Sequence, residues 1–106
     1  MSLLMLDADS FQSGIREKQV TLVEFGAKWC PPCKVLLPHL EAMSTEEGER
    51  ARLAQVDCDE SPQLAAEFGI MSLPTVIIFH NGEPVEKLVG LRPKSVYQTA
   101  LGRYIQ

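Results

Sequence analysis

Apolar residues follow two alternating patterns along the chain: short continuous runs, which are typical of buried strands, and stripes at helical spacing. The continuous runs predict strands at Leu3–Leu6, Val20–Gly26, Arg52–Asp57, Thr75–His80 and Glu83–Val89. The stripes between them predict helices capped by Asp7 or Asp9 and running to about Lys18, over Pro32–Glu47, from Ser61 to Gly69, and from Pro93 onward. This alternation indicates an α/β fold in which βαβ units precede one antiparallel hairpin.

Individual residues refine this outline. Pro38 lies inside the second helix and predicts a kink, because proline lacks an N–H and its ring clashes with the preceding turn. Ser61 and Pro62 predict a helix start, with the hydroxyl as the cap and proline at the first helical position. Asn81-Gly82 predicts a type I′ hairpin turn, and Pro84 then marks the last strand as an edge strand.

The length of 106 residues is that of one domain, and we expect residues 1–106 to fold as a single unit. The basic residues are dispersed, and the net charge is −4. This balance disfavours binding to nucleic acid or to an anionic membrane. No segment has the pattern of a leader peptide or a membrane span, so we expect a cytoplasmic protein. We also expect a monomer.

The residues with the clearest chemistry are the two cysteines of Trp29-Cys30-Pro31-Pro32-Cys33-Lys34, at the start of the long helix. At this spacing they are close enough to form a small disulfide ring. The positive end of the helix predicts a lowered pKa for Cys30, and the thiolate is the nucleophile of disulfide exchange. Cys33, one turn into the helix and more buried, would resolve the mixed disulfide. The pattern predicts dithiol–disulfide exchange.

Two alternatives to exchange chemistry are a metal site and a pair of inert core cysteines. A zinc site needs about four ligands, and the other candidates, Cys58, His39 and His80, lie at no recognised spacing. We therefore expect no bound metal. Cys58 is expected to be a small core residue of the third strand, with a redox-sensing thiol as the alternative.

Several segments, in the correct order, resemble the thioredoxin family, and the resemblance runs essentially end to end. The family's active-site strand, turn and helix resemble V-E-F-G-A-K-W-C-P-P-C-K, and its kinking proline falls at Pro38. Its third strand and following turn resemble V-D-C-D-E-S-P. Its cis-proline segment resembles M-S-L-P-T-V-I-I-F, its hairpin resembles F-H-N-G-E, and its glycine near the substrate groove matches Gly90.

This resemblance implies the thioredoxin fold, a central mixed five-stranded sheet in the order 1-3-2-4-5 flanked by four helices. It implies reversible exchange with protein disulfides, with Cys30 as the nucleophile and Cys33 as the resolving thiol of a redox-active disulfide. No cofactor would be bound, because the electrons would come from NADPH through a flavoprotein, thioredoxin reductase. The partners would be this reductase and disulfide-containing client proteins.

The resemblance also implies a substrate-binding surface. The Leu73-Pro74 bond would be cis and would face the cysteines. Cis bonds are almost exclusive to proline, so Pro74 is the only plausible site for one in this segment. The backbone of Leu73 could then pair with an extended substrate strand. The predicted substrate-binding residues are Trp29, Pro31, Pro32, Leu73, Pro74 and Gly90.

Four positions depart from the family's pattern. Pro31-Pro32 stands where thioredoxins usually have Gly-Pro, and Glu24 stands in place of a buried aspartate. Gly26 replaces a common tryptophan, and Gln55 replaces a lysine near the acid. These positions bear on the redox potential, the choice of partners and the transfer of protons.

Glu24 lies in the middle of an apolar central strand, where desolvation of a carboxylate is costly. The favoured interpretation is a catalytic role in proton transfer with the buried thiol, and the alternative is a carboxylate whose end reaches solvent. Trp29 is interpreted as a lid beside Cys30 rather than as a core residue. Lys28 and Lys34 are interpreted as solvated lysines, with assistance to the thiolate as the alternative.

These patterns together predict a protein-disulfide reductase. One alternative is a disulfide oxidant or isomerase, because the Pro-Pro pair could shift the redox potential. The other is a redox-inert binding or scaffold module in which the cysteines are incidental.

Overall fold

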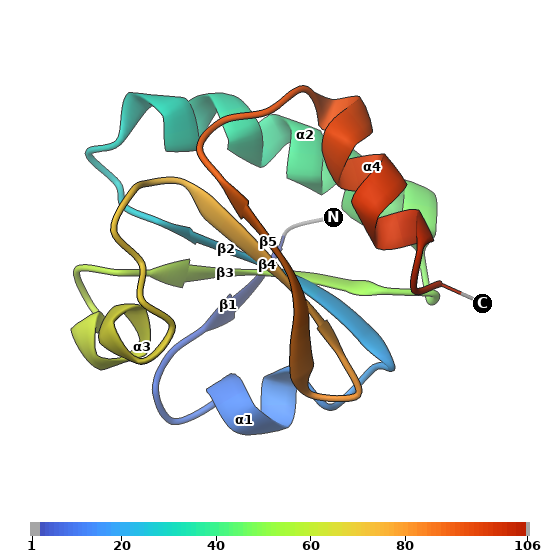
Figure 1. The fold of residues 1–106 in the computed structure, drawn as a ribbon, viewed down its shortest axis with the longest axis horizontal. Helices are drawn as coiled ribbons and strands as arrows, with labels where there is room; N and C mark the ends of the chain where they lie inside the picture. Colours follow the sequence, from blue (N-terminus) through green and yellow to red (C-terminus); the bar gives the residue numbers. More distant parts are fainter. Residues whose placement is uncertain (1–2, 106) are drawn as a thin grey trace.

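A mixed five-stranded sheet lies at the centre of the computed structural model, which describes residues 3–105 (Figure 1). Its strands are β1 (Leu4–Leu6), β2 (Val20–Gly26), β3 (Arg52–Asp57), β4 (Thr75–His80) and β5 (Glu83–Val89). The helices are α1 (Phe11–Gly14), α2 (Pro31–Glu47), α3 (Pro62–Glu67) and α4 (Lys94–Gly102). The strand order is β1-β3-β2-β4-β5, which confirms the predicted sheet.

The strand directions also follow the prediction. β1 and β2 both pair with β3 in parallel, whereas β4 runs antiparallel to β2 and to β5. The hairpin turns at Asn81 and Gly82, whose φ angles of 55° and 82° are both positive, as a type I′ turn requires. β5 lies at the edge of the sheet, as the presence of Pro84 predicts.

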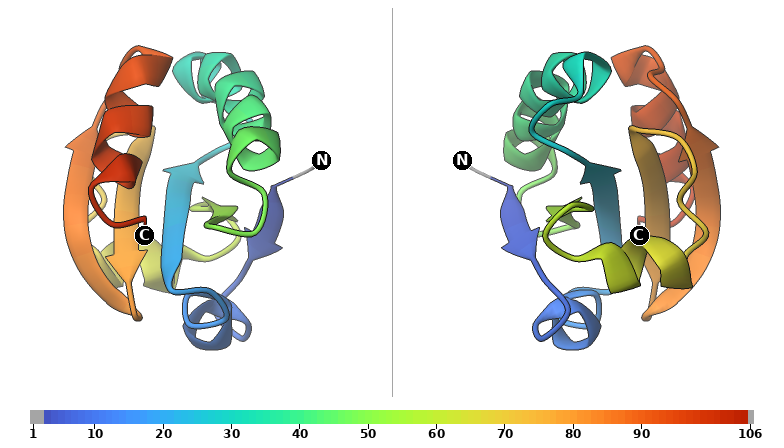
Figure 2. Two further views of the ribbon diagram at one scale, coloured as in Figure 1. Left: turned by 90° about the vertical axis from the view of Figure 1, so that its right-hand side faces the viewer. Right: turned by 90° about the vertical axis from the view of Figure 1, so that its left-hand side faces the viewer.

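Helices cover both faces of the sheet, with α2 and α4 on one face and α1 and α3 on the other (Figures 1 and 2). The apolar core accordingly forms two clusters, and β2 contributes to both: Leu22 packs under α2 and α4, and Val23 packs on the side of α1 and α3. Every residue of β2 is buried, which explains its continuous apolar run. Side chains alternate along a strand, so Glu24 points to the same face as Leu22, toward α2.

The first helix is shorter than predicted. α1 ends at Gly14 rather than near Lys18. Glycine is a poor helix former, and a Cβ at position 14 would lie 3.2 Å from Cδ1 of Leu6, so the position favours glycine for packing. The N-cap residue of α1 is Ser10 rather than Asp7 or Asp9, so the predicted cap is wrong. Oδ1 of Asp7 instead accepts hydrogen bonds from the amides of Asp9 and Ser10, at 3.0 Å each, in the turn that leads into α1.

α3 begins where predicted, with Ser61 as the N-cap residue and Pro62 at the first helical position. The hydroxyl of Ser61, however, makes no capping hydrogen bond. Instead, Oδ1 of Asp57 accepts the amides of Asp59 and Glu60 at 2.9 and 3.3 Å, and the Ser61 amide donates to the Asp57 carbonyl at 2.9 Å. The carboxylate at the end of β3 therefore organises the turn that leads into α3, and the expected cap from the serine hydroxyl is absent.

The other helix starts differ from the prediction by one residue. α2 begins at Pro31 and continues through Pro38, and α4 begins at Lys94, directly after Pro93. Within residues 3–105, no helix has the length and apolar character needed to cross a membrane.

Candidate active site

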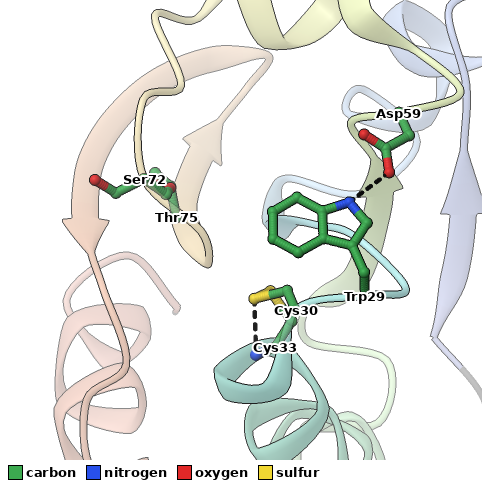
Figure 3. Close-up of a disulfide and its surroundings, with 6 residues drawn as sticks. All are labelled: Trp29, Cys30, Cys33, Asp59, Ser72 and Thr75. Atoms are coloured by element: carbon green, nitrogen blue, oxygen red, sulfur yellow. Dashed lines mark hydrogen bonds between the residues drawn. A yellow bond between two sulfur atoms is a disulfide. The ribbon is translucent and has the colours of Figure 1, made fainter.

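Two cysteines mark the N-terminal end of α2. Cys30 is the residue that precedes the helix, and Cys33 lies in its first turn. Their Cα atoms are 5.3 Å apart and their sulfur atoms form a disulfide (Figure 3). Both residues are only 3% exposed, so the prediction that Cys33 is the more buried of the two is wrong. The pair therefore forms the small ring that its spacing predicts.

The start of α2 determines which amides can stabilise negative charge at Cys30. The first amides of a helix have no partner inside the helix, and they lie at the positive end of its dipole. Pro31 and Pro32 have no N–H, so Cys33 supplies the amide that reaches Cys30, and it donates to Sγ at 3.3 Å. This arrangement favours a thiolate at Cys30, which is the reactive form in disulfide exchange.

Trp29 lies at the surface beside the disulfide, with 65% of its side chain exposed (Figure 3). Its Nε1 donates a hydrogen bond to Oδ2 of Asp59 at 2.7 Å, which fixes the indole against the turn after β3. Sequence reasoning missed Asp59, because the two residues are thirty positions apart. Lys28 forms an ion pair with Glu60 at 3.6 Å, and both side chains are exposed, as expected of a solvated lysine.

Glu24 is buried on β2, with 2% of its surface exposed, so the alternative in which its end reaches solvent is wrong. Its Oε2 has no hydrogen-bond partner among residues 3–105. Burial, and secondarily the negative charge of Asp57, raises the pKa of Glu24 to about 7. Gln55 is its partner in register on β3 and supplies no compensating charge. A group with this pKa can gain and lose a proton near neutral pH.

The loop before β4 lies across from the disulfide (Figure 3). Its Leu73-Pro74 bond is cis, as the resemblance implied. Oγ1 of Thr75 donates to the Ser72 carbonyl at 2.6 Å, and the Gly90 amide donates to the Pro74 carbonyl at 2.8 Å. These bonds hold the loop on both sides of the proline.

Comparison with known proteins agrees with this site. The thioredoxin family model matches residues 2–103. A thioredoxin of Staphylococcus aureus is 41% identical, and the match covers 93% of this chain and 93% of that protein. A thioredoxin of Staphylococcus epidermidis is 39% identical, and the match covers 99% of this chain and 100% of that protein. A solved mutant thioredoxin from Halobacterium salinarum superposes with a TM-score of 0.92 at 30% identity, covering 99% of this chain and 92% of that chain. The chain belongs to the thioredoxin family.

Membership in the thioredoxin family identifies the reaction that the Cys30–Cys33 pair carries out. The chain is a protein thiol–disulfide oxidoreductase, and its homologues support the activity of a protein-disulfide reductase. The redox-active disulfide is the group that carries the electrons, and the family has no bound cofactor beyond it. Thioredoxins typically work with thioredoxin reductase and with disulfide-containing clients.

Exposed apolar side chains occur in the segments that carry the thioredoxin site. Besides Trp29, they include Met71, which is 95% exposed, and Leu91, which directly follows Gly90. Pro31 and Pro32 are also exposed. Exposed apolar surface of this kind is typical of a protein-binding site. Sequence reasoning missed Met71 and Leu91, because apolarity alone does not distinguish an exposed residue from a core residue.

Tyr97 holds the loop that follows β5. Its side chain is fully buried in α4, and its hydroxyl donates to the Gly90 carbonyl at 3.1 Å and accepts from the Arg92 amide at 3.0 Å. Gly90 has a φ of 85°, a conformation that favours glycine. Tyr97 lies outside the motifs that identify the site, so the sequence alone does not connect it with Gly90.

Cys58 lies just after β3, half-buried, rather than within the strand as predicted. Its amide donates to the Gly26 carbonyl at 2.8 Å. Burial, with further contributions from nearby carboxylates, raises the pKa of this thiol to about 11. A thiol that stays protonated near neutral pH reacts slowly, which argues against the redox-sensing alternative. His39 and His80 are half-buried, and His80 contacts Tyr104 with ring centroids 5.8 Å apart.

Proposed function

We propose that the chain reduces disulfides of client proteins, with Cys30 as the nucleophile and Cys33 as the resolving thiol. The observation that carries this proposal is the hydrogen bond from the Cys33 amide to Sγ of Cys30 at the start of α2. It favours Cys30, rather than Cys33, as the sulfur that bears the negative charge. The chain then acts as a single-domain monomer in the cytoplasm.

The reaction has two exchange steps. The Cys30 thiolate first attacks one sulfur of the client disulfide, forms a mixed disulfide and releases the other client sulfur, which takes up a proton. Cys33 then loses its proton and attacks Sγ of Cys30, so the bond to the client breaks and the second client thiol leaves. The Cys30–Cys33 disulfide remains, and two electrons have passed to the client. A flavoprotein, thioredoxin reductase, restores the dithiol with electrons from NADPH.

Glu24 is the proton acceptor for Cys33 in the second step, directly or through a water molecule. Its burial beside Cys33 and a pKa of about 7 support this role, because an efficient general base titrates near the working pH.

An extended segment of the client binds beside Cys30. Among the described residues, the backbone N–H and C=O of Leu73 take part in no hydrogen bond, so they are available to a client strand. The remaining contacts come from the residues around this backbone and the disulfide: Trp29, Pro31, Pro32, Pro74 and Gly90.

A trapping experiment tests the order of attack. Cys33→Ser leaves Cys30 able to attack but removes the thiol that releases the client, so mixed disulfides accumulate through Cys30. Mass spectrometry of the adducts identifies the cysteine. The control is Cys33→Ser combined with Cys30→Ser, which should trap nothing. Adducts through Cys58, or trapping by Cys30→Ser alone, would show that the nucleophile is assigned wrongly.

A further inference from the structure

The carboxyl group of Glu24 occupies the space that the missing side chain of Gly26 leaves. Residues two apart on a strand point to the same face, so both positions face α2. A Cβ on Gly26 would overlap Oε2 of Glu24, and it would lie 3.0 Å from Cδ of Glu24 and 3.1 Å from Sγ of Cys33. The carboxyl group therefore lies over the Cα of Gly26, next to the sulfur of the resolving cysteine.

The backbone at position 26 does not itself require glycine. Gly26 ends β2 in register with Asp57, and it is not among the glycines with a positive φ angle. Any residue could adopt this strand conformation, so the constraint at this position is one of space.

A small cavity lies beside the carboxyl group. It has a volume of about 70 Å³, and Glu24, Gly26 and Cys33 line it together with Lys28 and Met5. Lys28 and Met5 are exposed, so the cavity lies between the buried carboxyl and the surface. A polar space of this size is large enough to hold water. Such waters would supply the partner that Oε2 does not find among residues 3–105.

We infer that Gly26 is a positioning residue for thiol–disulfide exchange: because it has no side chain, the longer side chain of Glu24 can place its carboxyl group beside Cys33. This inference rests on the proposed role of Glu24 as proton acceptor. It also connects two of the departures from the family's pattern. The glutamate has one methylene more than the usual aspartate, and the glycine gives that extra length its space.

Stopped-flow reaction of the reduced protein with 5,5′-dithiobis(2-nitrobenzoate) tests the inference. The first release of coloured thiol reports the attack by Cys30, and the second reports the attack by Cys33 on the mixed disulfide. In Gly26→Ala the carboxyl has to turn away from Cys33, so the second phase should slow at least about fivefold, while the first changes less than about twofold. Gly102→Ala is the matched control, because a Cβ at position 102 meets nothing within 4 Å, and it should leave both phases unchanged.

A double-variant cycle shows whether the two positions act together. Glu24→Asp shortens the acid, so its carboxyl no longer reaches the space above Gly26. Adding Gly26→Ala to Glu24→Asp should therefore change the second phase by less than about twofold, although the same alanine has a large effect beside glutamate. Equal slowing in both backgrounds, or a Gly26→Ala variant that resolves at the wild-type rate, would overturn the inference.

The pH dependence of the second phase gives a readout that a simple packing defect would not move. The ionisable groups around Glu24 are Cys33, Lys28, Asp57, Cys58 and Tyr97. These groups are unchanged in Gly26→Ala. If the carboxyl group of Glu24 moves, the inflection that Glu24 causes in the plot of the second-phase rate against pH should therefore shift by at least about half a pH unit. An unshifted inflection would contradict the inference.

Two further results separate this inference from the proposed function. If Glu24→Gln resolves as fast as wild type, Glu24 is not the proton acceptor, and the proposed function fails on that point. If Glu24→Gln is slow and Gly26→Ala is normal, only the inference about Gly26 fails. If Gly26→Ala does not fold, the variant that combines Glu24→Asp with Gly26→Ala decides. A folded double variant whose second phase is as fast as that of Glu24→Asp supports the inference, and an unfolded double variant overturns it.

Discussion

The carboxyl group of Glu24, the proposed proton acceptor, makes the stability of the fold depend on pH. In the folded protein its pKa is raised from an ordinary 4.5 to about 7, first by burial and then by the charge of Asp57. Between these two values the unfolded chain releases a proton that the folded chain keeps. The free energy of unfolding therefore falls as the pH rises through this range and stays reduced above it. A shift of this size corresponds to roughly 3 kcal/mol.

Glu24→Gln removes this penalty while nearly preserving the volume of the side chain. At about pH 8 the variant should be more stable than wild type by up to about 3 kcal/mol, and the gain should shrink below pH 7 and vanish near pH 4.5. Urea denaturation across this pH range measures the difference. Glu46→Gln is the control, because hydrogen bonds from Lys94 and Gln98 lower the pKa of that exposed carboxyl, so its removal should give no stabilisation. A Glu24→Gln variant less stable than wild type at pH 8 would contradict the expected penalty.

At the scale of elements, the first turn of α2 governs the balance between dithiol and disulfide. A strong oxidant of this superfamily is one whose reduced form is stabilised. A capping side chain can accept from the second and third amides of a helix. In this chain Pro32 removes the second, so the Cys30 thiolate has one amide, that of Cys33. The reduced form therefore gains less from α2 than it would with both amides, which favours a reducing potential.

Equilibration with glutathione redox buffers should give a potential below about −230 mV, and a value near −120 to −180 mV would favour the alternative of an oxidant or isomerase. Pro32→Ala restores an amide at the second helical position, from which it can reach Sγ of Cys30. This variant should raise the potential by at least about 15 mV, equivalent to about 0.7 kcal/mol. Pro31→Ala is the control, because an amide at the first position does not point at the capping sulfur. Equal shifts in the two variants would contradict the argument.

The limits of an element could be predicted where the local sequence sets them. They could not be predicted where contacts with residues elsewhere in the fold set them. The continuous apolar run of β2 and the Asn81-Gly82 turn carry their own signals, because burial on both faces and positive φ angles select particular residue types. α1 ends early, at Gly14, where close packing against Leu6 competes with the helical pattern. That contact is invisible in a linear sequence.

At the scale of the whole molecule, the site is assembled from segments far apart in the chain. The spacing of the two cysteines could place Cys30 and Cys33, and the resemblance to the thioredoxin family could place the cis bond at Pro74. Two contacts could not be predicted, because they depend on side-chain conformations across the sheet. They are the hydrogen bond between Trp29 and Asp59 and the position of the Glu24 carboxyl group over Gly26. The sequence identified which residues carry the chemistry but not what holds them in place.

Tyr97 is the clearest example of a distant residue that supports the site. Its hydroxyl joins α4 to the Gly90 carbonyl and the Arg92 amide, and the Gly90 amide in turn holds the Pro74 carbonyl opposite the disulfide. Tyr97→Phe keeps the ring in the core and removes only the hydroxyl. The loss of two hydrogen bonds should lower the free energy of unfolding by about 1–2 kcal/mol.

The effect of Tyr97→Phe on activity should depend on the size of the substrate. In the proposed function a client protein contacts the loops around Pro74 and Gly90, whereas a small disulfide needs only the cysteines. The KM for insulin reduction should therefore rise at least about threefold, while the rate with 5,5′-dithiobis(2-nitrobenzoate) stays within about twofold of wild type. Tyr104→Phe is the matched control, because that tyrosine contacts His80 rather than the site loops, and it should leave both activities unchanged. Equal losses with both substrates would mean that Tyr97 supports the fold in general and not the surface that binds clients.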